Sequence, residues 1–440
     1  MPGDWFLDIF TSAAEKLVEY LGRDGYAHLP DDIDLGWWIP GLPEVSEVPR
    51  LAAVDGGAGI IQLEGGASLY IARAFGYVED GEPERDMELR LYPVRDARVL
   101  DMLRTWVEHR TARRMVYRLP KGSILFMDGS MKAVISTALS QVLKLHSGPA
   151  SSLTLVYAGL LASYVLIELV ELVAEASRRG VLLAYVSKDH RYTALKEKVL
   201  LEHVASRAPE TSSLVRAALE WYPLAARDQL VGLRRILPAR LRRALDAALD
   251  RGYTDSAFIG DVQGPLQGYT YELTLPPPLR VARLLSRKGQ KELAERLVEK
   301  ASALAPGEVE EAEFAATAPR LSEALPLLPQ VRLTYARLGV HDAPLLIELP
   351  GPLAGFYSAG RELREPGADV VTVVSALRRS YAGPAHYNVP LVAAHVNATL
   401  DSRQLASYAR LLEHLSSLRG YSLKPARRAV MGRTLRRRSG

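Results

Sequence analysis

Two aspartates share the same local context, an apolar run before them and a glycine after them. Asp55 follows residues 51–54, and Asp128 follows residues 123–127. Carboxylates at strand ends are held rigidly by a sheet while remaining open to substrate, and Mg²⁺ and Mn²⁺ prefer such oxygen ligands. In phosphodiester cleavage, one such cation, or two that lie about 3.5–4 Å apart, stabilise the attacking and leaving oxygens. A single Asp-Gly is usually only a turn, so a shared metal site and two separate turns remain alternatives.

Two further side chains are candidates for the same site. Glu108 lies in a predicted helix over residues 97–118, where its local sequence equally fits a solvated helix acid. Asp101 and Glu84 are the alternatives to it. His395 follows Pro390, which suits a first helical turn, and lies about one and a half turns into an Ala-rich helix. A histidine there is a packed core residue, a metal ligand or a proton carrier.

Basic residues near the predicted strands and at the C-terminus are candidates for contacting an anion. Lys188 follows an apolar strand over residues 181–186 and either neutralises a phosphate as a point charge or is an ordinary surface lysine. Residues 424–440 carry seven basic side chains and no acid, so this terminal block attracts nucleic acid or merely aids solubility. Its predicted DNA-binding residues are Arg427, Arg428, Arg436, Arg437 and Arg438.

The elements that must position these residues follow an α/β order. Three predicted strands (51–54, 67–78 and 87–92) precede the helix over 97–118, and a fourth strand over 123–127 is followed by two helices and a fifth strand. This order predicts an RNase H-like fold with a mixed five-stranded core sheet, flanking helices and a large helical insertion. In that fold, acids occupy the first strand, the first helix and the end of the fourth strand, where this sequence has Asp55, Glu108 and Asp128.

Shifts in composition divide the chain into five predicted parts. They are an N-terminal helix and arm (1–48), the first part of the RNase H-like core (49–196), a mostly helical insertion (197–325), the C-terminal part of the core (326–420) and the basic tail (421–440). Residues 252–275 are expected to form a turn and a strand inside the insertion. The amphipathic helix over residues 5–21 is a candidate docking element for a partner.

Composition excludes several classes of protein. The 440 residues are 48% hydrophobic and 24% charged, as in ordinary globular proteins, and contain no cysteine, which rules out disulfide scaffolds, thiolate metal sites and cysteine nucleophiles. The N-terminus lacks a basic signal region, and the apolar stretch over residues 153–167 is expected to be a buried helix. We therefore expect a cytoplasmic protein without membrane association, and the excess of arginine over lysine is compatible with a thermophilic source.

Several short motifs, taken in order, resemble the NurA family of archaeal and bacterial DNA-repair nucleases. They are residues 52–57, 125–130, 185–188, 335–338, 346–350 and 387–395, and the likeness spans about residues 51–400. In the family a serine often follows the first glycine of the first motif, where this chain has Gly57.

The resemblance implies a metal-dependent nuclease with an RNase H-like core. NurA proteins are homodimers that use a divalent metal, typically Mn²⁺ and otherwise Mg²⁺, with two ions expected per site. They cut single-stranded DNA endonucleolytically, degrade DNA ends with 5′ to 3′ polarity, and work with the hexameric HerA translocase in end resection for recombinational repair. Carried over by position, the metal-binding and catalytic residues are Asp55, Glu108, Asp128 and His395, and Tyr387 is an active-site tyrosine.

Two other functions remain as alternatives on the same fold. The first is a non-catalytic DNA-binding or regulatory subunit of the translocase, although such a protein has no need for several converging carboxylates. The second is an RNA-cleaving relative, which the absence of an evident aromatic platform for unstacked bases disfavours.

Overall fold

The computed structural model describes residues 10–11, 14–15, 29–30, 32–44, 49–147, 152–188, 190–221, 227–275, 295, 299, 308–354, 361–421 and 424–426. The chain divides into two compact units. Unit 1 comprises residues 1–36, 191–219 and 223–264, and unit 2 comprises residues 37–190, 220–222 and 265–440. Most of the residues that the sequence singles out for chemistry lie in unit 2.

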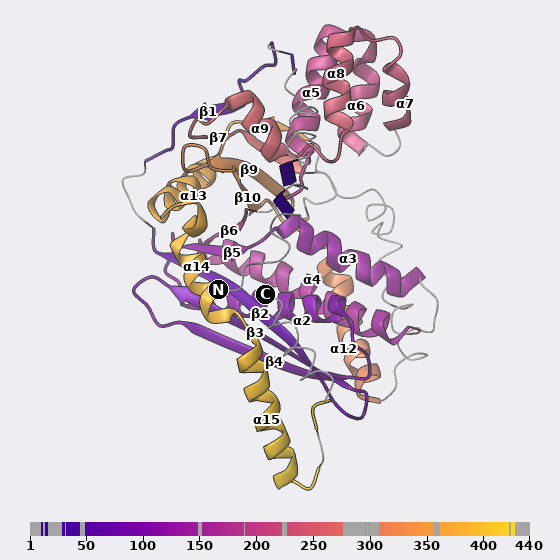
Figure 1. Ribbon diagram of the computed structural model, residues 1–440, viewed down its shortest axis with the longest axis vertical. Helices are drawn as coiled ribbons and strands as arrows, with labels where there is room; N and C mark the ends of the chain where they lie inside the picture. Colours follow the sequence, from indigo (N-terminus) through magenta and orange to yellow (C-terminus); the bar gives the residue numbers. More distant parts are fainter. Residues whose placement is uncertain are drawn as a thin grey trace. The chain divides into compact units, whose positions relative to one another are not determined.

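Unit 2 contains a large mixed sheet with helices on its faces (Figure 1). Its strands are β1 (Trp38–Pro40), β2 (Leu51–Gln62), β3 (Ser68–Val78), β4 (Glu84–Tyr92), β5 (Ile124–Asp128), β6 (Leu182–Ser187), β7 (Gly268–Thr270), β8 (Glu272–Leu275), β9 (Val331–Arg337), β10 (Leu345–Pro350) and β11 (Leu363–Arg364). Its helices are α2 (Ala97–Arg118), α3 (Met131–Ser147), α4 (Leu153–Arg179), α12 (Glu308–Ala324), α13 (Ala368–Arg379), α14 (Val389–Ala398) and α15 (Ser402–Leu418).

The main path of the sheet runs β1-β7-β9-β10-β6-β5-β2-β3-β4, with β8 and β11 paired off it. Strands β2, β5 and β6 are parallel to one another, whereas β2 with β3, β3 with β4, and β10 with β6 are antiparallel. All five predicted strands are present, but the expected five-stranded sheet is too small, because the described residues form an eleven-stranded sheet. Strands β9 and β10 extend it through antiparallel pairing beyond β6.

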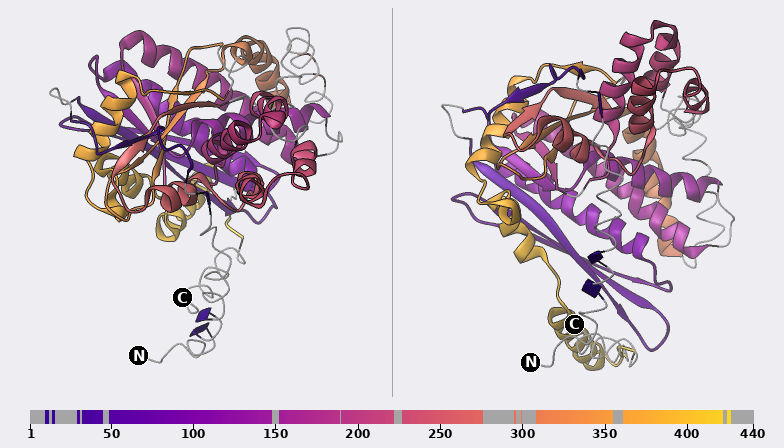
Figure 2. Two further views of the ribbon diagram at one scale, coloured as in Figure 1. Left: turned by 90° about the horizontal axis from the view of Figure 1, so that it is seen from above. Right: turned by 45° about the horizontal axis from the view of Figure 1, so that its top comes forward.

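Helices cover both faces of the central strands. A continuous core joins alternate residues of β2, β5, β6 and β10 to the apolar sides of α13 and α14. On the other face, α2 packs against β2, β3 and α4. Figure 2 shows the long strands β2, β3 and β4 running side by side, as their registers require. Side chains alternate along a strand, so Asp55 and Asp128 share the face that α14 covers.

Strand β2 differs from the expectation in a way that affects the candidate site. The sequence predicts a strand that ends in a turn at Asp55, but β2 continues through Asp55 and its glycines to Gln62. The glycines are required by close packing rather than by a turn. A Cβ on Gly56 would lie 2.4 Å from Glu108 Oε1, and a Cβ on Gly57 would lie 2.0 Å from the Ala398 carbonyl oxygen.

Helix α4 contains the most apolar stretch of the chain, and its prediction as a buried helix is confirmed. It is longer than expected, with 27 residues, and by length and composition alone it is sufficient to cross a membrane. In the structure it packs against α2, α3 and α12, and 78% of its apolar window is buried. Its burial is that of a core helix of unit 2.

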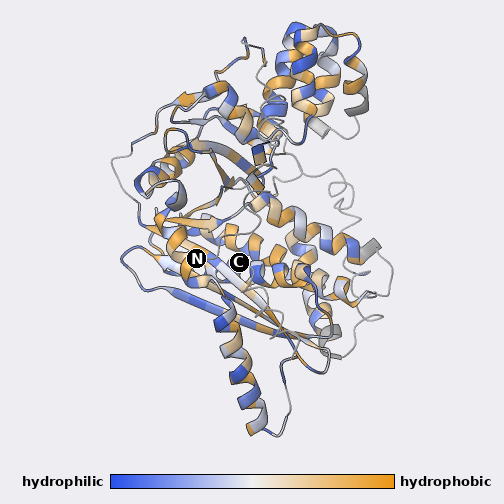
Figure 3. Cartoon of the chain, viewed as in Figure 1, coloured by the Kyte–Doolittle hydropathy of each residue, from blue (hydrophilic) through white to orange (hydrophobic). Residues whose placement is uncertain are grey.

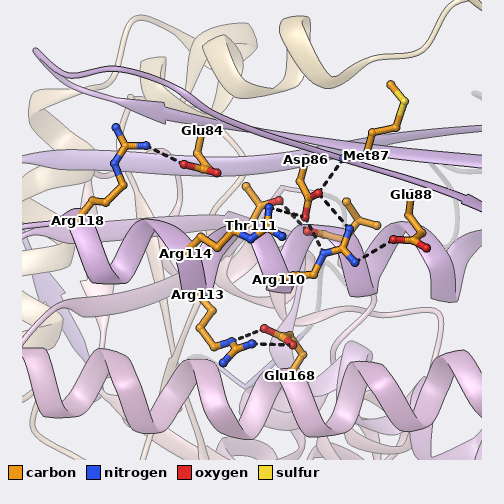
Figure 4. A network of polar contacts seen from close by, with 11 residues as sticks. Glu84, Asp86, Met87, Glu88, Arg110, Thr111, Arg113, Arg114, Arg118 and Glu168 are labelled. Atoms are coloured by element: carbon orange, nitrogen blue, oxygen red, sulfur yellow. Dashed lines mark hydrogen bonds and ion pairs between the residues drawn. The ribbon is translucent and has the colours of Figure 1, made fainter. Parts of the chain in front are cut away.

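Polar contacts join edge strand β4 to α2 (Figure 4). Glu84, Asp86 and Glu88 alternate along β4 and face α2, where Arg110 contacts Asp86 at 2.6 Å and Glu88 at 2.9 Å. Arg118 contacts Glu84 at 2.7 Å. These ion pairs join the C-terminal half of α2 to strand β4.

Unit 1 is helical in its described part. Its helices are α5 (Ala194–Arg207), α6 (Ser212–Trp221, which ends in unit 2), α7 (Arg227–Leu233), α8 (Ala239–Leu249) and α9 (Asp255–Gln263). The buried Lys196 ammonium donates to the carbonyls of Ala247, Ala248 and Asp250, so it caps α8. The expectation of only a turn and a strand over residues 252–275 is wrong at α9, whose first turn is capped by the Thr254 hydroxyl accepting from Ala257 N–H.

Candidate metal centre

The two predicted aspartates lie side by side at the end of a parallel strand pair. Strands β2 and β5 are in register from Leu51 opposite Ile124 to Val54 opposite Met127, so Asp55 and Asp128 each follow the last pair. Strand β5 ends at Asp128, whereas β2 continues. Asp55 is buried and accepts a hydrogen bond from Gly56 N–H at 2.7 Å, and Asp128 is exposed. The structure thus brings together the two carboxylates that the sequence paired.

His395 completes this group from α14. The Asn388 side chain caps the helix by accepting from Leu391 N–H at 2.9 Å, and Pro390 lies in the first turn as predicted. Helix α14 is largely apolar along its length (Figure 3), yet the His395 side chain is 65% exposed, so it is not a packed core residue. Its Nδ1 lies 2.6 Å from Asp55 Oδ2. Ligand atoms of His395, Asp55 and Asp128 all lie within 4.8 Å of one another.

Glu108 approaches the same cluster from α2, across the position where Gly56 has no side chain. It lies outside the three-residue group, but its carboxylate interacts electrostatically with both Asp55 and Asp128. Burial raises the pKa of Glu108 to about 8; the nearby Arg104 guanidinium opposes this shift, and the two aspartates add to it. Glu84, one of the two alternatives to Glu108, lies on β4 and pairs with Arg118 of α2.

Asp128 is held by Tyr387, which directly precedes the Asn388 cap of α14. The Tyr387 hydroxyl donates to Asp128 Oδ1 at 3.1 Å. Loss of hydration raises the pKa of Asp128, the charge of Asp55 adds to this effect, and the Tyr387 hydrogen bond opposes it. Lys188 is exposed, and its Nζ lies 5.5 Å from the centre of the Tyr387 ring. Both predicted residues therefore lie beside the carboxylates.

The donor set fits a hard divalent cation. Two carboxylates and an imidazole converge, a third carboxylate lies nearby, and the chain has no thiolate. Oxygen and imidazole ligands suit Mg²⁺ and Mn²⁺. Like charges this close raise one another's pKa in the absence of a cation, which is the direction found for Asp128 and Glu108. A bound divalent ion would remove that repulsion.

Two residues that support this centre were missed by sequence reasoning. Arg73 in β3 donates to the Ala398 carbonyl at 2.8 Å and to the Thr399 carbonyl, so it holds the C-terminus of the helix that carries His395. Glu348 in β10 is fully buried and accepts from Lys132 N–H at 3.2 Å, in the first turn of the helix that follows Asp128. The only signal for Glu348 is one charge in an otherwise apolar run, and Arg73 has no distinctive local sequence.

The remaining predicted DNA-binding residues lie outside the described part of the chain. They are Arg427, Arg428, Arg436, Arg437 and Arg438. The described chain reaches residues 424–426, which run beside the end of β2: Glu64 N–H donates to the Lys424 carbonyl, and Ala426 N–H donates to the Gln62 carbonyl. Most of the predicted N-terminal helix also lies outside the described residues.

Comparisons with known proteins give the likeness of this chain to solved structures and to one family. The chain is similar to the NurA nuclease from Sulfolobus solfataricus, with a TM-score of 0.53 and 12% identity over 93% of this chain and 96% of that one. A second solved structure of NurA gives a TM-score of 0.45 and 12% identity over 92% and 97%. No curated protein matches the sequence. The sequence model of the NurA domain matches residues 49–400, which contain every element of the centre, and the chain therefore belongs to the NurA family.

Proposed function

We propose that this protein is a metal-dependent deoxyribonuclease whose active site is the cluster of Asp55, Asp128 and His395. The observation that carries the proposal is the convergence of their ligand atoms within 4.8 Å, in a chain of a family that includes a solved nuclease. A scaffold protein has no use for carboxylates that repel one another at a surface open to solvent. The cluster therefore favours catalysis over the non-catalytic alternative.

The proposed core is RNase H-like. Its five strands are β4, β3, β2, β5 and β6 in spatial order, with the acids on the central strand β2 and on its parallel neighbour β5. This order supports the predicted fold, because β2, the first of the five strands along the chain, is also the central strand of the five. We also propose the five parts of the chain predicted from the sequence, with boundaries after residues 48, 196, 325 and 420.

The proposed cofactor is Mn²⁺ or Mg²⁺, with two ions per site. Asp55, Asp128 and His395 would hold one ion, and Glu108 is placed to contribute to a second. Bound cations would supply Lewis-acid stabilisation of the charge that develops on the phosphate. Nδ1 of His395 lies 2.6 Å from Asp55 Oδ2, so a cation held by Asp55 would have this imidazole within reach as a nitrogen ligand.

The chain's other residues hold the carboxylates and the substrate. Tyr387 fixes the orientation of Asp128 through its hydroxyl. The exposed ammonium of Lys188 interacts favourably with Asp128 and is placed to neutralise a phosphate oxygen as a point charge. Together they would orient a scissile phosphate over the carboxylates.

The proposed substrates and partners follow from family membership. They are single-stranded DNA, cut endonucleolytically, and duplex ends, degraded with 5′ to 3′ polarity. We propose that the protein acts in the cytoplasm as a homodimer, in end resection for recombinational repair with a HerA-type translocase, and that the arginines after residue 426 attract DNA.

Cleavage of a labelled single-stranded DNA oligonucleotide with and without Mn²⁺ tests this proposal. Asp55→Asn and Asp128→Asn should each lower the rate by at least about 100-fold, because a lost ligand removes several kcal/mol of charge stabilisation. Asp101→Asn is the matched control, since this acid lies on α2 outside the three-residue cluster. Full activity in either variant of the site, or cleavage by the wild type without any divalent ion, contradicts the proposal.

A further inference from the structure

Arg104 occupies an unusual position beside the proposed active site. It lies on α2 one turn before Glu108, and its Nε is 3.6 Å from Glu108 Oε1, beyond hydrogen-bonding distance. The Nε atom is buried and has no hydrogen-bond partner in the described part of the chain. The side chain as a whole remains 42% exposed, so part of the guanidinium is open to solvent.

Other arginines on α2 donate hydrogen bonds to carboxylates of the protein itself (Figure 4). Arg110 donates to both Asp86 and Glu88, and Arg118 donates to Glu84 at 2.7 Å. Arg113 donates to Glu168. These side chains form the ion pairs that attach α2 to its neighbours. The Nε of Arg104 makes no such hydrogen bond, so attaching α2 to its neighbours does not explain why an arginine occupies this position.

The surroundings of Arg104 are those of the metal centre. Its charge interacts with Glu108 first, and further with Asp101, Asp55 and Asp128. In the sheet order, α2 packs on β2 and β3, whereas Lys188 follows β6 on the other side of β5. The carboxylates of Asp55 and Asp128 therefore interact with two cations from different elements, the partly exposed Arg104 on α2 and the exposed Lys188 after β6.

We propose that Arg104 is a catalytic residue that binds the DNA backbone phosphate on the α2 side of the carboxylate cluster. This inference rests on the proposed nuclease function. The planar guanidinium donates in a fixed fork that matches two phosphate oxygens, and the bond is charge-assisted. A phosphate oxygen would bind the solvent-open terminal nitrogens of the guanidinium, which make no hydrogen bond within the described part of the chain. Lys188 binds the backbone on the other side as a point charge, so the strand lies across the cluster.

Single-turnover cleavage of a labelled single-stranded DNA oligonucleotide at saturating Mn²⁺ tests the assignment. Arg104→Gln should lower the cleavage rate by about 10- to 100-fold, because a charge-assisted contact to the reacting phosphate is lost. Arg104→Lys should recover part of that loss, since it keeps the charge but not the fork. Arg118→Gln is the matched control: it lies on the same helix with similar exposure, pairs with Glu84, and should cleave at the wild-type rate.

Two further measurements separate phosphate binding from a structural role. For Arg104→Gln, the slope of log affinity for single-stranded DNA against log salt should become shallower by about 0.7, the value for one lost phosphate contact. The rise in melting temperature caused by Mn²⁺ should be unchanged. If Arg104→Gln instead reduces Mn²⁺ stabilisation but cleaves normally at saturating Mn²⁺, Arg104 only supports Glu108 and the inference is wrong.

The outcomes distinguish this inference from the function on which it rests. Cleavage by the wild type together with normal cleavage by Arg104→Gln overturns the role of Arg104 and leaves the nuclease assignment intact. Failure of the wild type to cleave DNA with Mn²⁺ overturns both. Slow cleavage by Arg104→Gln, with the shallower salt slope and normal metal stabilisation, supports both.

Discussion

Each aspartate of the proposed centre is oriented by one side chain from the same short segment of the chain. His395 contacts Asp55, and Tyr387, eight residues earlier, contacts Asp128. Side chains that hold a metal-binding carboxylate commonly change metal affinity or activity by about 10- to 100-fold when removed. Residues 387–395 therefore orient both carboxylates.

At this scale, Tyr387→Phe should lower the cleavage rate or the apparent Mn²⁺ affinity by about 10-fold, because Asp128 loses its hydrogen bond. Tyr381→Phe is the matched control, since the Tyr381 hydroxyl donates to Asp342. Rates measured over a Mn²⁺ titration would reveal the difference. Equal activity of both variants at every Mn²⁺ concentration would refute the role of Tyr387.

At the scale of elements, the position of α14 depends on its close contact with β2 and β3. Gly57 and Arg73 are register partners on these strands. The first leaves room for the Ala398 carbonyl, and the second donates to it at 2.8 Å and also to Tyr408 and Gln404 on α15. The His395 helix is thus anchored at its C-terminal end by contacts that do not touch the centre.

We expect Arg73→Met to destabilise the protein by about 1–3 kcal/mol, because the buried Ala398 carbonyl loses its donor, and to lower activity through displacement of His395. Urea unfolding and the cleavage assay measure the two effects. Arg85→Met on the exposed side of β4 is the control and should change neither. Wild-type stability in Arg73→Met would show that this anchor is unimportant.

Much of the core and the centre was predictable at this scale, and the exceptions have physical causes. Helix α2 begins and ends at the predicted residues, because its periodicity is long and its ends are marked. Asp55, Asp128 and His395 converge as expected. Strands β1, β7 and β11 have two or three residues, too few for a periodic signal. The glycines of β2 looked like a turn because the approach of Glu108 and Ala398 is visible only in three dimensions.

At the scale of the whole molecule, the proposed site lies within the described fold, whereas the arginines of the basic terminal block lie beyond the described residues. Six arginines follow Ala426, and residues 424–426 are paired with the end of β2. A chain that ends at Ala426 therefore keeps this pairing and loses the basic block. It should bind DNA more weakly and with a shallower salt dependence, while cleavage at saturating DNA is nearly unchanged.

Fluorescence anisotropy at several salt concentrations, together with cleavage rates at saturating DNA, checks this expectation. Loss of cleavage at saturating DNA, with the salt slope unchanged, would place the block in the chemistry instead of in binding.

The central claim is that Asp55, Asp128 and His395 form a divalent metal site, and calorimetric titration with Mn²⁺ tests it most directly. We predict saturable binding by the wild type and by Asp101→Asn, and a loss of affinity of at least about 10-fold in Asp128→Asn, whose amide cannot replace the carboxylate charge. Folding of each variant is verified by its melting curve. Mn²⁺ binding of equal affinity in Asp128→Asn and in the wild type would contradict the account.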